Sequence, residues 1–307
     1  MWDPMKIKLK DSWEQKGRRS RPIPNSEIID FIGEKVNHKY LYSEEILPAF
    51  TKEYYEWIQN SKLNTLHGLE KFNQLDFVHG TSQAFDFFYM KHHNKRFRCL
   101  RGDYAYHKVS WSNYFNWAYV EDDELRKNDA LIISMPFSDL GSEHPATQGL
   151  LDTCDALGIP VFIDAAYYCI ARNVDFNLDR PCIDTIAFSM SKAFYGVERL
   201  RVGIRCQRSS VDDGAVLFNQ FHCVAKIAAG VGLELCQNFE HDYNQNKFRD
   251  KQLEICKELN IEPSDCVLFG LADQNHPEFG DYDRGTEWRR VCISTLLGDV
   301  NEITVPD

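Results

Sequence analysis

Hydrophobic and polar positions follow the clearest pattern in the middle of the chain, where short apolar runs are separated by amphipathic stretches. The apolar runs Ala130–Met135, Val161–Ile163, Thr185–Ser189 and Leu200–Cys206 predict strands. Between the first two, Pro145–Leu157 has helical spacing and is followed by a glycine, which is a suitable residue to end a helix. Strands that alternate with helices predict an α/β domain with a mostly parallel central sheet.

The N-terminal part shows the same alternation less regularly. Residues 1–35 are expected to form an irregular arm, because Pro22 and Pro24 would break a helix. Glu44–Gln59 has the spacing of an amphipathic helix. Leu75–Val78 predicts a strand, followed by a loop and a helix from Gln83 to His92, and Phe97–Leu100 predicts one more strand.

The pattern changes after about Asn238, where a charged helical stretch, Asp250–Leu259, is followed by two short strands around Cys266–Leu271 and Arg290–Ser294. We therefore expect three parts: residues 1–60 as an arm and a portion of a small domain, residues 61–238 as a large domain, and residues 239–307 as a small α+β domain.

Composition narrows the class of protein. With 35 basic and 46 acidic residues the net charge is −11, which argues against general binding to nucleic acids or anionic membranes. No apolar run is long enough for a transmembrane helix, and the charged N-terminus does not resemble a signal peptide. The ten cysteines lack CxxC spacing and fit buried, reduced thiols, so we expect a cytoplasmic protein without a metal site.

Polar residues follow several of the predicted strands directly. Because strand ends of a parallel sheet meet at one edge, these residues are expected to face a common crevice. One lysine, one aspartate, one arginine and several hydroxyls would suit a phosphorylated cofactor that has a ring nitrogen and an aldehyde. The residues are Gly80, Thr81, Ser82, Ser138, Asp164, Tyr167, Ser189, Ser191, Lys192 and Arg201.

The motifs that contain these residues resemble those of the fold-type I pyridoxal-phosphate enzymes. In order they read HGTSQA, PFSDLG, IDAAYY, SMSKAF and RLRVG, between residues 79 and 203. The resemblance is closest to the class I/II aminotransferases, which include histidinol-phosphate aminotransferase, although the chain is short for that family. It implies a cofactor, pyridoxal 5'-phosphate, and transfer of an amino group between an amino acid and a keto acid or aldehyde.

The resemblance assigns the catalytic roles to three residues. Lys192 would hold the cofactor as a Schiff base and later move protons at the α-carbon of the substrate. Asp164 would pair with the pyridinium nitrogen and keep it protonated. Tyr167 would donate a hydrogen bond to the phenolic oxygen of the ring.

It also implies the contacts that hold the cofactor. Gly80, Thr81 and Ser82 open a helix and would bind the phosphate, together with Ser189, Ser191 and Arg201. Arg199 is the alternative to Arg201 if the register differs by two residues. Tyr104 would stack on the pyridine ring, with Tyr106 and His107 as competitors for that role.

Two segments outside the main motifs have weaker counterparts in the family. In Tyr40-Leu41-Tyr42, the resemblance favours Tyr42 as the residue that reaches the phosphate of the partner subunit, and Tyr40 as a substrate contact. Arg290 would grip the α-carboxylate of the substrate, because its planar fork suits bidentate binding. A homodimer with sites at the interface follows from the same resemblance.

One position departs from the family. Ser138 stands where the family usually has an asparagine that contacts the phenolic oxygen, and either Ser138 or Asp139 could replace that contact. The departure keeps a second reaction class open, namely a lyase, decarboxylase, racemase or γ-replacement enzyme with the same cofactor. A non-catalytic relative is a third alternative, against which the intact Lys192, Asp164 and Arg201 argue.

Overall fold

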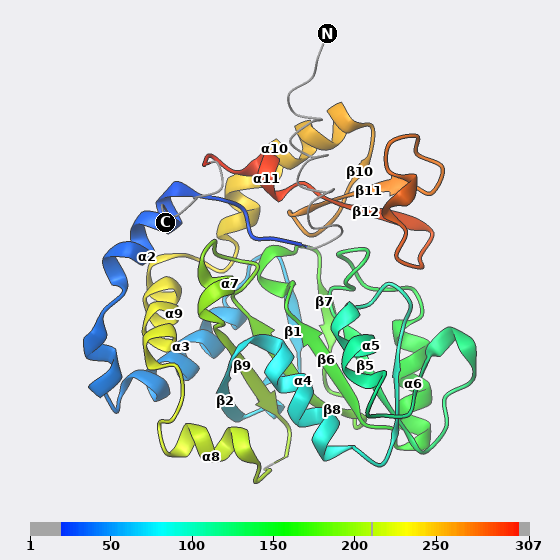
Figure 1. The fold of residues 1–307 in the computed structure, drawn as a ribbon, viewed down its shortest axis with the longest axis horizontal. Coiled ribbons are helices and arrows are strands. Elements are labelled where there is room, and N and C mark those ends of the chain that lie inside the picture. The colour runs from blue at the N-terminus through cyan, green and yellow to red at the C-terminus, as the bar shows by residue number, and fades with distance from the viewer. Residues whose placement is uncertain (1–19, 210, 301–307) are drawn as a thin grey trace.

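The computed structural model describes residues 20–209 and 211–300 and is built around a seven-stranded sheet (Figure 1). In spatial order the strands are β2 (Gln74–Val78), β9 (Gly203–Gln207), β8 (Ile183–Ser189), β6 (Val161–Ala165), β5 (Asp129–Ser134), β3 (Arg96–Cys99) and β4 (Trp117–Tyr119). Only β9 runs opposite to the other strands of this sheet. The predicted α/β fold with a mostly parallel sheet is confirmed.

Successive residues of the central strands point to opposite faces of the sheet, and each face has its own apolar core. On β5, Ala130 and Ile132 pack with α4 (Gly80–Lys91) and α5 (Ala105–Trp111). Leu131 and Ile133 of the same strand belong to the larger core on the other face. That core includes side chains from α3 (Ile46–Gln59), α6 (Thr147–Leu157) and α9 (Lys226–Asn238). All strand residues of β5 are buried, as expected for a sheet covered on both sides.

A smaller antiparallel sheet follows the large one in the chain and lies above it in Figure 1. It contains β10 (Glu262–Pro263), β11 (Phe269–Asp273) and β12 (Trp288–Cys292), with α10 (Tyr243–Leu259) and α11 (Ser294–Leu297) beside it. This region agrees with the strands and charged helix expected after Asn238.

The N-terminal residues differ from the expected irregular arm. Residues 20–25 are irregular, but Ser26–Lys35 form α2, so the prediction is wrong for this part. Both prolines precede the helix and therefore do not interrupt it. The backbone oxygen of Pro24 accepts a hydrogen bond from the Asp299 amide, which joins this segment to the C-terminal region. Residues 1–19 of the expected arm and residues 301–307 of the expected small domain lie outside the described residues.

The remaining elements connect or flank these layers. The other helices are α7 (Val197–Leu200) and α8 (Gly214–Gln220), and β1 (Thr65–His67) pairs with β7 (Asp175–Asn177). Short 3-10 turns occur at η1 (His38–Tyr42), η2 (Leu69–Lys71), η3 (Val120–Asp122), η4 (Tyr168–Ile170) and η5 (Gly280–Tyr282). In the part of the chain that the structure describes, no helix is long and apolar enough to cross a membrane. All cysteines except Cys223 and Cys292 are buried.

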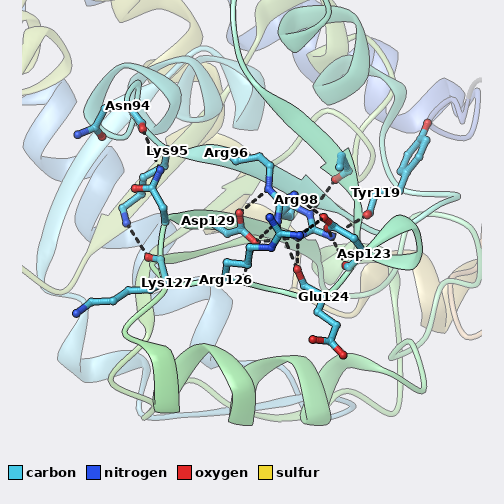
Figure 2. A network of polar contacts seen from close by, with 12 residues as sticks. Asn94, Lys95, Arg96, Arg98, Tyr119, Asp123, Glu124, Arg126, Lys127 and Asp129 are labelled. Atoms are coloured by element: carbon cyan, nitrogen blue, oxygen red, sulfur yellow. Dashed lines mark hydrogen bonds and ion pairs between the residues drawn. The ribbon is translucent and has the colours of Figure 1, made fainter.

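A network of ion pairs and hydrogen bonds holds the 119–129 loop against β3 and β5 (Figure 2). The Arg98 guanidinium, with none of its side chain exposed, contacts the Asp129 carboxylate at 2.8 Å and donates to the backbone oxygens of Tyr119 and Glu124. Arg96 contacts the same carboxylate at 2.7 Å and also reaches Asp123. Burying these charges is tolerated because each has an oppositely charged partner and further hydrogen bonds.

Candidate active site

The predicted polar residues lie together at one edge of the large sheet. The carboxyl ends of β2, β5, β6 and β8 meet there, and β9 begins there because it runs in the opposite direction. A pocket of about 70 Å³ lies against this edge. A larger cavity of about 1150 Å³ shares the lining residues Ser20, Tyr104, Ser138, Tyr167 and Lys192 with it. The predicted residues that line the smaller pocket are Thr81, Ser82, Tyr104, Ser138, Asp164, Tyr167, Ser189, Ser191, Lys192 and Arg201.

Lys192 comes three residues after the end of β8 and is half-buried in the wall of both cavities. Its Nζ donates a hydrogen bond of 2.8 Å to the backbone oxygen of Ser20. The preceding turn is held by the Ser189 hydroxyl, which donates to the Ser191 hydroxyl at 2.9 Å and accepts from the Ser191 amide at 3.2 Å. The lysine amine is therefore presented to the cavity from a fixed turn.

Asp164 is buried near the end of β6, facing the same pocket. Burial, and then the nearby charge of Asp103, raise the pKa of its carboxyl to about 7. Hydrogen bonds from the Ala166 amide, at 3.1 Å, and from the Thr81 side chain oppose this rise. A buried carboxylate with so high a pKa favours a cationic partner within the pocket.

Tyr167 and Arg290 join the large sheet to the small one. Nη1 of Arg290, on β12, donates to the Tyr167 hydroxyl at 3.1 Å and to the backbone oxygen of Ser138. Its guanidinium lies 4.5 Å from the centre of the Phe269 ring. The Tyr167 hydroxyl is also 2.7 Å from the Ser20 hydroxyl. Arg290 lines the larger cavity, beside the pocket that holds Asp164.

A cradle of hydroxyls and one guanidinium forms where α4 begins. Arg201 donates to the His79 backbone oxygen at 3.1 Å and to the Ser82 hydroxyl. Gly80 has φ +70°, and a side chain there would approach the Arg201 Nη2 atom to 3.0 Å. Glycine is therefore required for this close approach. The helix starts at Gly80 rather than at Gln83, so Thr81 and Ser82 occupy the first turn, where amides favour an anion.

Arg201 itself has φ +62°, which is uncommon for a residue other than glycine. With this backbone conformation Arg201 ends α7. Its guanidinium lies close to Gly80. Arg199, the alternative from the sequence, is exposed and contacts Glu198 instead.

The three aromatic candidates for stacking on the cofactor ring lie in different surroundings. Tyr104 lines both cavities and is 44% exposed. The Tyr106 hydroxyl donates to the Asp86 carboxylate at 2.9 Å. His107 is fully buried and its Nδ1 is 2.7 Å from the Tyr89 hydroxyl, while burial lowers its pKa to about 3. Tyr104 is thus the one of these three that lines the pocket containing Asp164 and Lys192.

Tyr40 and Tyr42 lie on η1, away from both cavities of their own chain. The Tyr40 hydroxyl donates to Glu234 at 3.3 Å, and its ring packs against Gly230 of α9. Tyr42 is 80% exposed.

Ser138 and Asp139 take different positions after β5. Ser138 lines both cavities, whereas Asp139 is buried and accepts a hydrogen bond from the Thr286 hydroxyl. The Asp139 carboxylate also lies 3.4 Å from Nε of Arg284. Of the two residues left open by the sequence, Ser138 is the one that faces the pocket.

The structure adds residues that the motifs did not indicate. Asp103 is buried behind Tyr104 and accepts hydrogen bonds from the Tyr104 amide, at 2.7 Å, and from the Ser134 hydroxyl. Its position after a predicted strand could have singled it out. Ser20 and Arg284 come from an irregular segment and a long loop, where no strand end or motif marks them.

The donor set fits a phosphorylated pyridine aldehyde. An amine, a buried carboxylate and a hydroxyl–guanidinium cradle line one pocket, which is what the aldehyde, ring nitrogen and phosphate would each require. Among the described residues, no group of three or more His, Cys, Asp or Glu side chains could hold a metal ion.

Comparison with known proteins points to one family. The sequence model described as aminotransferase class I and II matches residues 91–258. No curated protein sequence matches the chain. Among solved structures, the aromatic aminotransferase from Pyrococcus horikoshii is similar with a TM-score of 0.64 and 13% identity, over 94% of each chain.

Two further structures of the same fold are named for different activities. A C-S lyase from Staphylococcus hominis, bound to pyridoxal phosphate, has a TM-score of 0.58 and 13% identity, over 91% of this chain and 84% of its own. The histidinol-phosphate aminotransferase from Clostridium acetobutylicum has a TM-score of 0.54 and 12% identity, over 82% of this chain and 80% of its own.

Proposed function

The chain belongs to the family of class I and II aminotransferases, and from this premise we propose that it transfers an amino group between an amino acid and a keto acid or aldehyde. Its cofactor is pyridoxal phosphate, as in the family and in the bound C-S lyase structure. The observation that carries the proposal is the single pocket lined by Lys192, Asp164 and Arg201.

Each residue of the pocket has a task in this reaction. When bound, the cofactor supplies an electron-withdrawing ring that makes the α-carbon of the substrate acidic. Lys192 binds the cofactor covalently through Nζ and moves the proton at the α-carbon, which its place in the wall of both cavities supports. Asp164 holds the ring nitrogen in its protonated form, because a cation offsets the cost of ionising a buried carboxyl.

The remaining contacts orient the cofactor and substrate. Thr81, Ser82, Ser189, Ser191 and Arg201 bind the phosphate at the start of α4. Tyr167 donates to the phenolic oxygen, and Tyr104 covers the ring. Arg290 binds the α-carboxylate of the substrate from the larger cavity.

The covalent role of Lys192 can be tested directly. Protein incubated with pyridoxal phosphate is expected to gain a visible absorption band, and reduction with borohydride should fix the cofactor on Lys192 in peptide mass spectra. Lys192→Ala should lose both signals, whereas Lys127→Ala, at an exposed position far from the pocket, should keep them. A label fixed mainly on another lysine, or no label, would refute the proposal.

Two observations favour a second reaction class on the same site. Ser138 replaces the asparagine expected at this position, and one structure of the same fold is a C-S lyase. An amino donor alone distinguishes the two classes. In an aminotransferase it should convert the bound cofactor to the amine form, with loss of the visible band. A lyase should release its product and recover the band.

We further propose a homodimer in which Tyr42 enters the site of the partner subunit. Tyr42 is strongly exposed, and the neighbouring Leu41 and Val36 are also large exposed apolar residues. Such residues are suited to burial in an interface. Lys226, on α9, supports this segment by donating to the backbone oxygen of Leu41 at 3.1 Å.

A further inference from the structure

Arg284, with 12% of its side chain exposed, reaches the candidate active site from the loop between β11 and β12. Its Nη2 atom donates to the backbone oxygens of Gly102 and Asp103, at 3.0 and 3.2 Å, and to the Ser138 hydroxyl oxygen at 3.3 Å. Its Nε lies 3.4 Å from the Asp139 carboxylate. The side chain therefore ties three segments of the chain together at the wall of the larger cavity.

The close packing of these segments fixes where the guanidinium can lie. Gly102 has φ +83°, and a side chain at this position would come within 2.7 Å of Thr286 and 3.1 Å of Asp139. Ser138 is held from its other side as well, because its backbone oxygen accepts a hydrogen bond from Arg290. The backbone of Ser138 is thus held at the wall of the pocket.

The chemistry of the pair determines the direction of the hydrogen bond. A guanidinium has donors and no acceptor, so the Ser138 oxygen must accept. The single hydroxyl proton of Ser138 cannot then point at Arg284 and is left for another acceptor. Ser138 lines the same pocket as Tyr167 and Lys192. The proton is therefore available to a group bound there.

We propose that Arg284 is a positioning residue that makes Ser138 a hydrogen-bond donor to the phenolic oxygen of the bound cofactor. This inference rests on the proposed function. Ser138 and Arg284 together would then do what a side-chain amide could do alone, namely donate a hydrogen bond to that oxygen. Two donors, Tyr167 and Ser138, would then hold negative charge on that oxygen, with Arg284 behind the second.

The charges around Arg284 are compatible with this role. Burial, and then the nearby Arg290, lower the pKa of Arg284 to about 10, while Asp139, Tyr167 and Asp103 act in the opposite direction. The side chain stays cationic at neutral pH. Its charge is balanced mainly by Asp139, so the guanidinium supports Ser138 without leaving Asp139 unpaired.

The test is a pH titration of the visible band in the cofactor-loaded protein, which reports protonation of the nitrogen joining Lys192 to the cofactor. Donors that stabilise negative charge on the phenolic oxygen lower the pKa of this nitrogen. Arg284→Met and Ser138→Ala are each expected to raise the spectral midpoint by about one pH unit. The double variant should match Ser138→Ala, because Arg284 acts through the serine.

Controls separate the alternatives. Arg289→Met removes a neighbouring arginine that bonds to the backbone oxygens of Gly280 and Thr286 and does not line the cavities, and it should leave the midpoint unchanged. Arg284→Lys keeps a charge beside Asp139 and should shift the midpoint less than Arg284→Met does. If Arg284→Met does not fold, Arg284→Lys and Ser138→Ala still test the proposal.

Three results would overturn it. An unchanged midpoint in Ser138→Ala shows that the serine makes no such contact. If the midpoint shifts of the two single variants add in the double variant, Arg284 acts by its charge alone and not through Ser138. A raised KM with an unchanged midpoint in Arg284→Met shows that the arginine binds substrate instead. In each case the visible band still forms, whereas failure of the proposed function would remove the band from the unmutated protein.

Discussion

The buried carboxyl of Asp164 has a strongly raised pKa, which makes its charge state a measurable property of the cofactor-free protein. Burial, and then Asp103, raise its pKa from an ordinary 3.8 to about 7. The folded state therefore binds a proton more tightly than the unfolded state, so this group stabilises the fold at low pH. That stability is lost as the pH rises from about 4 through about 7, by an amount on the order of 4 kcal/mol.

Replacing Asp164 with asparagine removes this dependence. Urea unfolding of cofactor-free protein between pH 5 and pH 8 should show Asp164→Asn gaining stability over the unmutated protein as the pH rises. Asp30→Asn, at an exposed carboxylate, should show no such trend. A stability difference between Asp164→Asn and the unmutated protein that does not vary with pH would contradict the assignment.

Some residues of the candidate site can be predicted from the sequence and others cannot. Lys192 follows β8, Asp164 lies near the end of β6 and Arg201 precedes the antiparallel β9, so the order and direction of the strands bring all three to one edge of the sheet. Arg284 and Ser20 reach the same edge through loop packing and an irregular segment. Such contacts depend on tertiary structure, and no local period or motif encodes them.

The buried network around Arg98 acts at the scale of elements, because it holds the 119–129 loop against β3 and β5 (Figure 2). Asp129 keeps Arg96 as a cationic partner after Arg98 is lost, so the expected cost is near the lower end of the range for removing one partner of a buried ion pair, about 3 kcal/mol. Arg98→Met should lower the free energy of unfolding by this amount in urea titrations. The arginine donates to backbone oxygens of the loop as well as to Asp129, so its loss also leaves those oxygens unpaired.

Arg126 provides the matched comparison in the same network. It contacts Asp123 at 3.0 Å, but its side chain is 68% exposed. Exposed ion pairs contribute only about 0–1 kcal/mol, so Arg126→Met should have a small effect. Equal losses in the two variants would show that burial of Arg98 is not what makes it important.

At the element scale, the sequence predicted strands and helices well where burial is complete. The strand at β5 and the helix ending at Gly158 agree closely with expectation, because apolar runs and a positive-φ glycine leave few alternatives. For Ser26–Lys35 the sequence predicts an irregular arm where the structure has a helix, because Pro22 and Pro24 precede this segment and do not interrupt it. A helix that begins just after prolines shows the same local signal as an irregular arm.

At the scale of the whole molecule, the candidate active site contains residues from distant parts of the chain. Ser20 meets Lys192, and Arg290 meets Tyr167 across the boundary between the two sheets. Tyr42 lies outside both cavities of its own chain. If Tyr42 completes a site, it must do so in a second subunit.

Hybrid dimers test that arrangement. Lys192→Ala and Tyr42→Ala subunits are each expected to form defective homodimers, but a mixed dimer would combine the intact Lys192 of one chain with the intact Tyr42 of the other. After random exchange of subunits, about a quarter of all sites should regain tight cofactor binding and conversion by an amino donor. The readout is the visible band at limiting pyridoxal phosphate.

The same experiment gives the opposite result if Tyr42 acts within its own chain. Every site of a mixed dimer would then lack either the lysine or the tyrosine, and mixing would restore nothing. Differently tagged subunits show whether exchange has occurred, because about half of the dimers should then carry both tags. If dimers that carry both tags form and no site is restored, Tyr42 does not act in the site of the partner subunit.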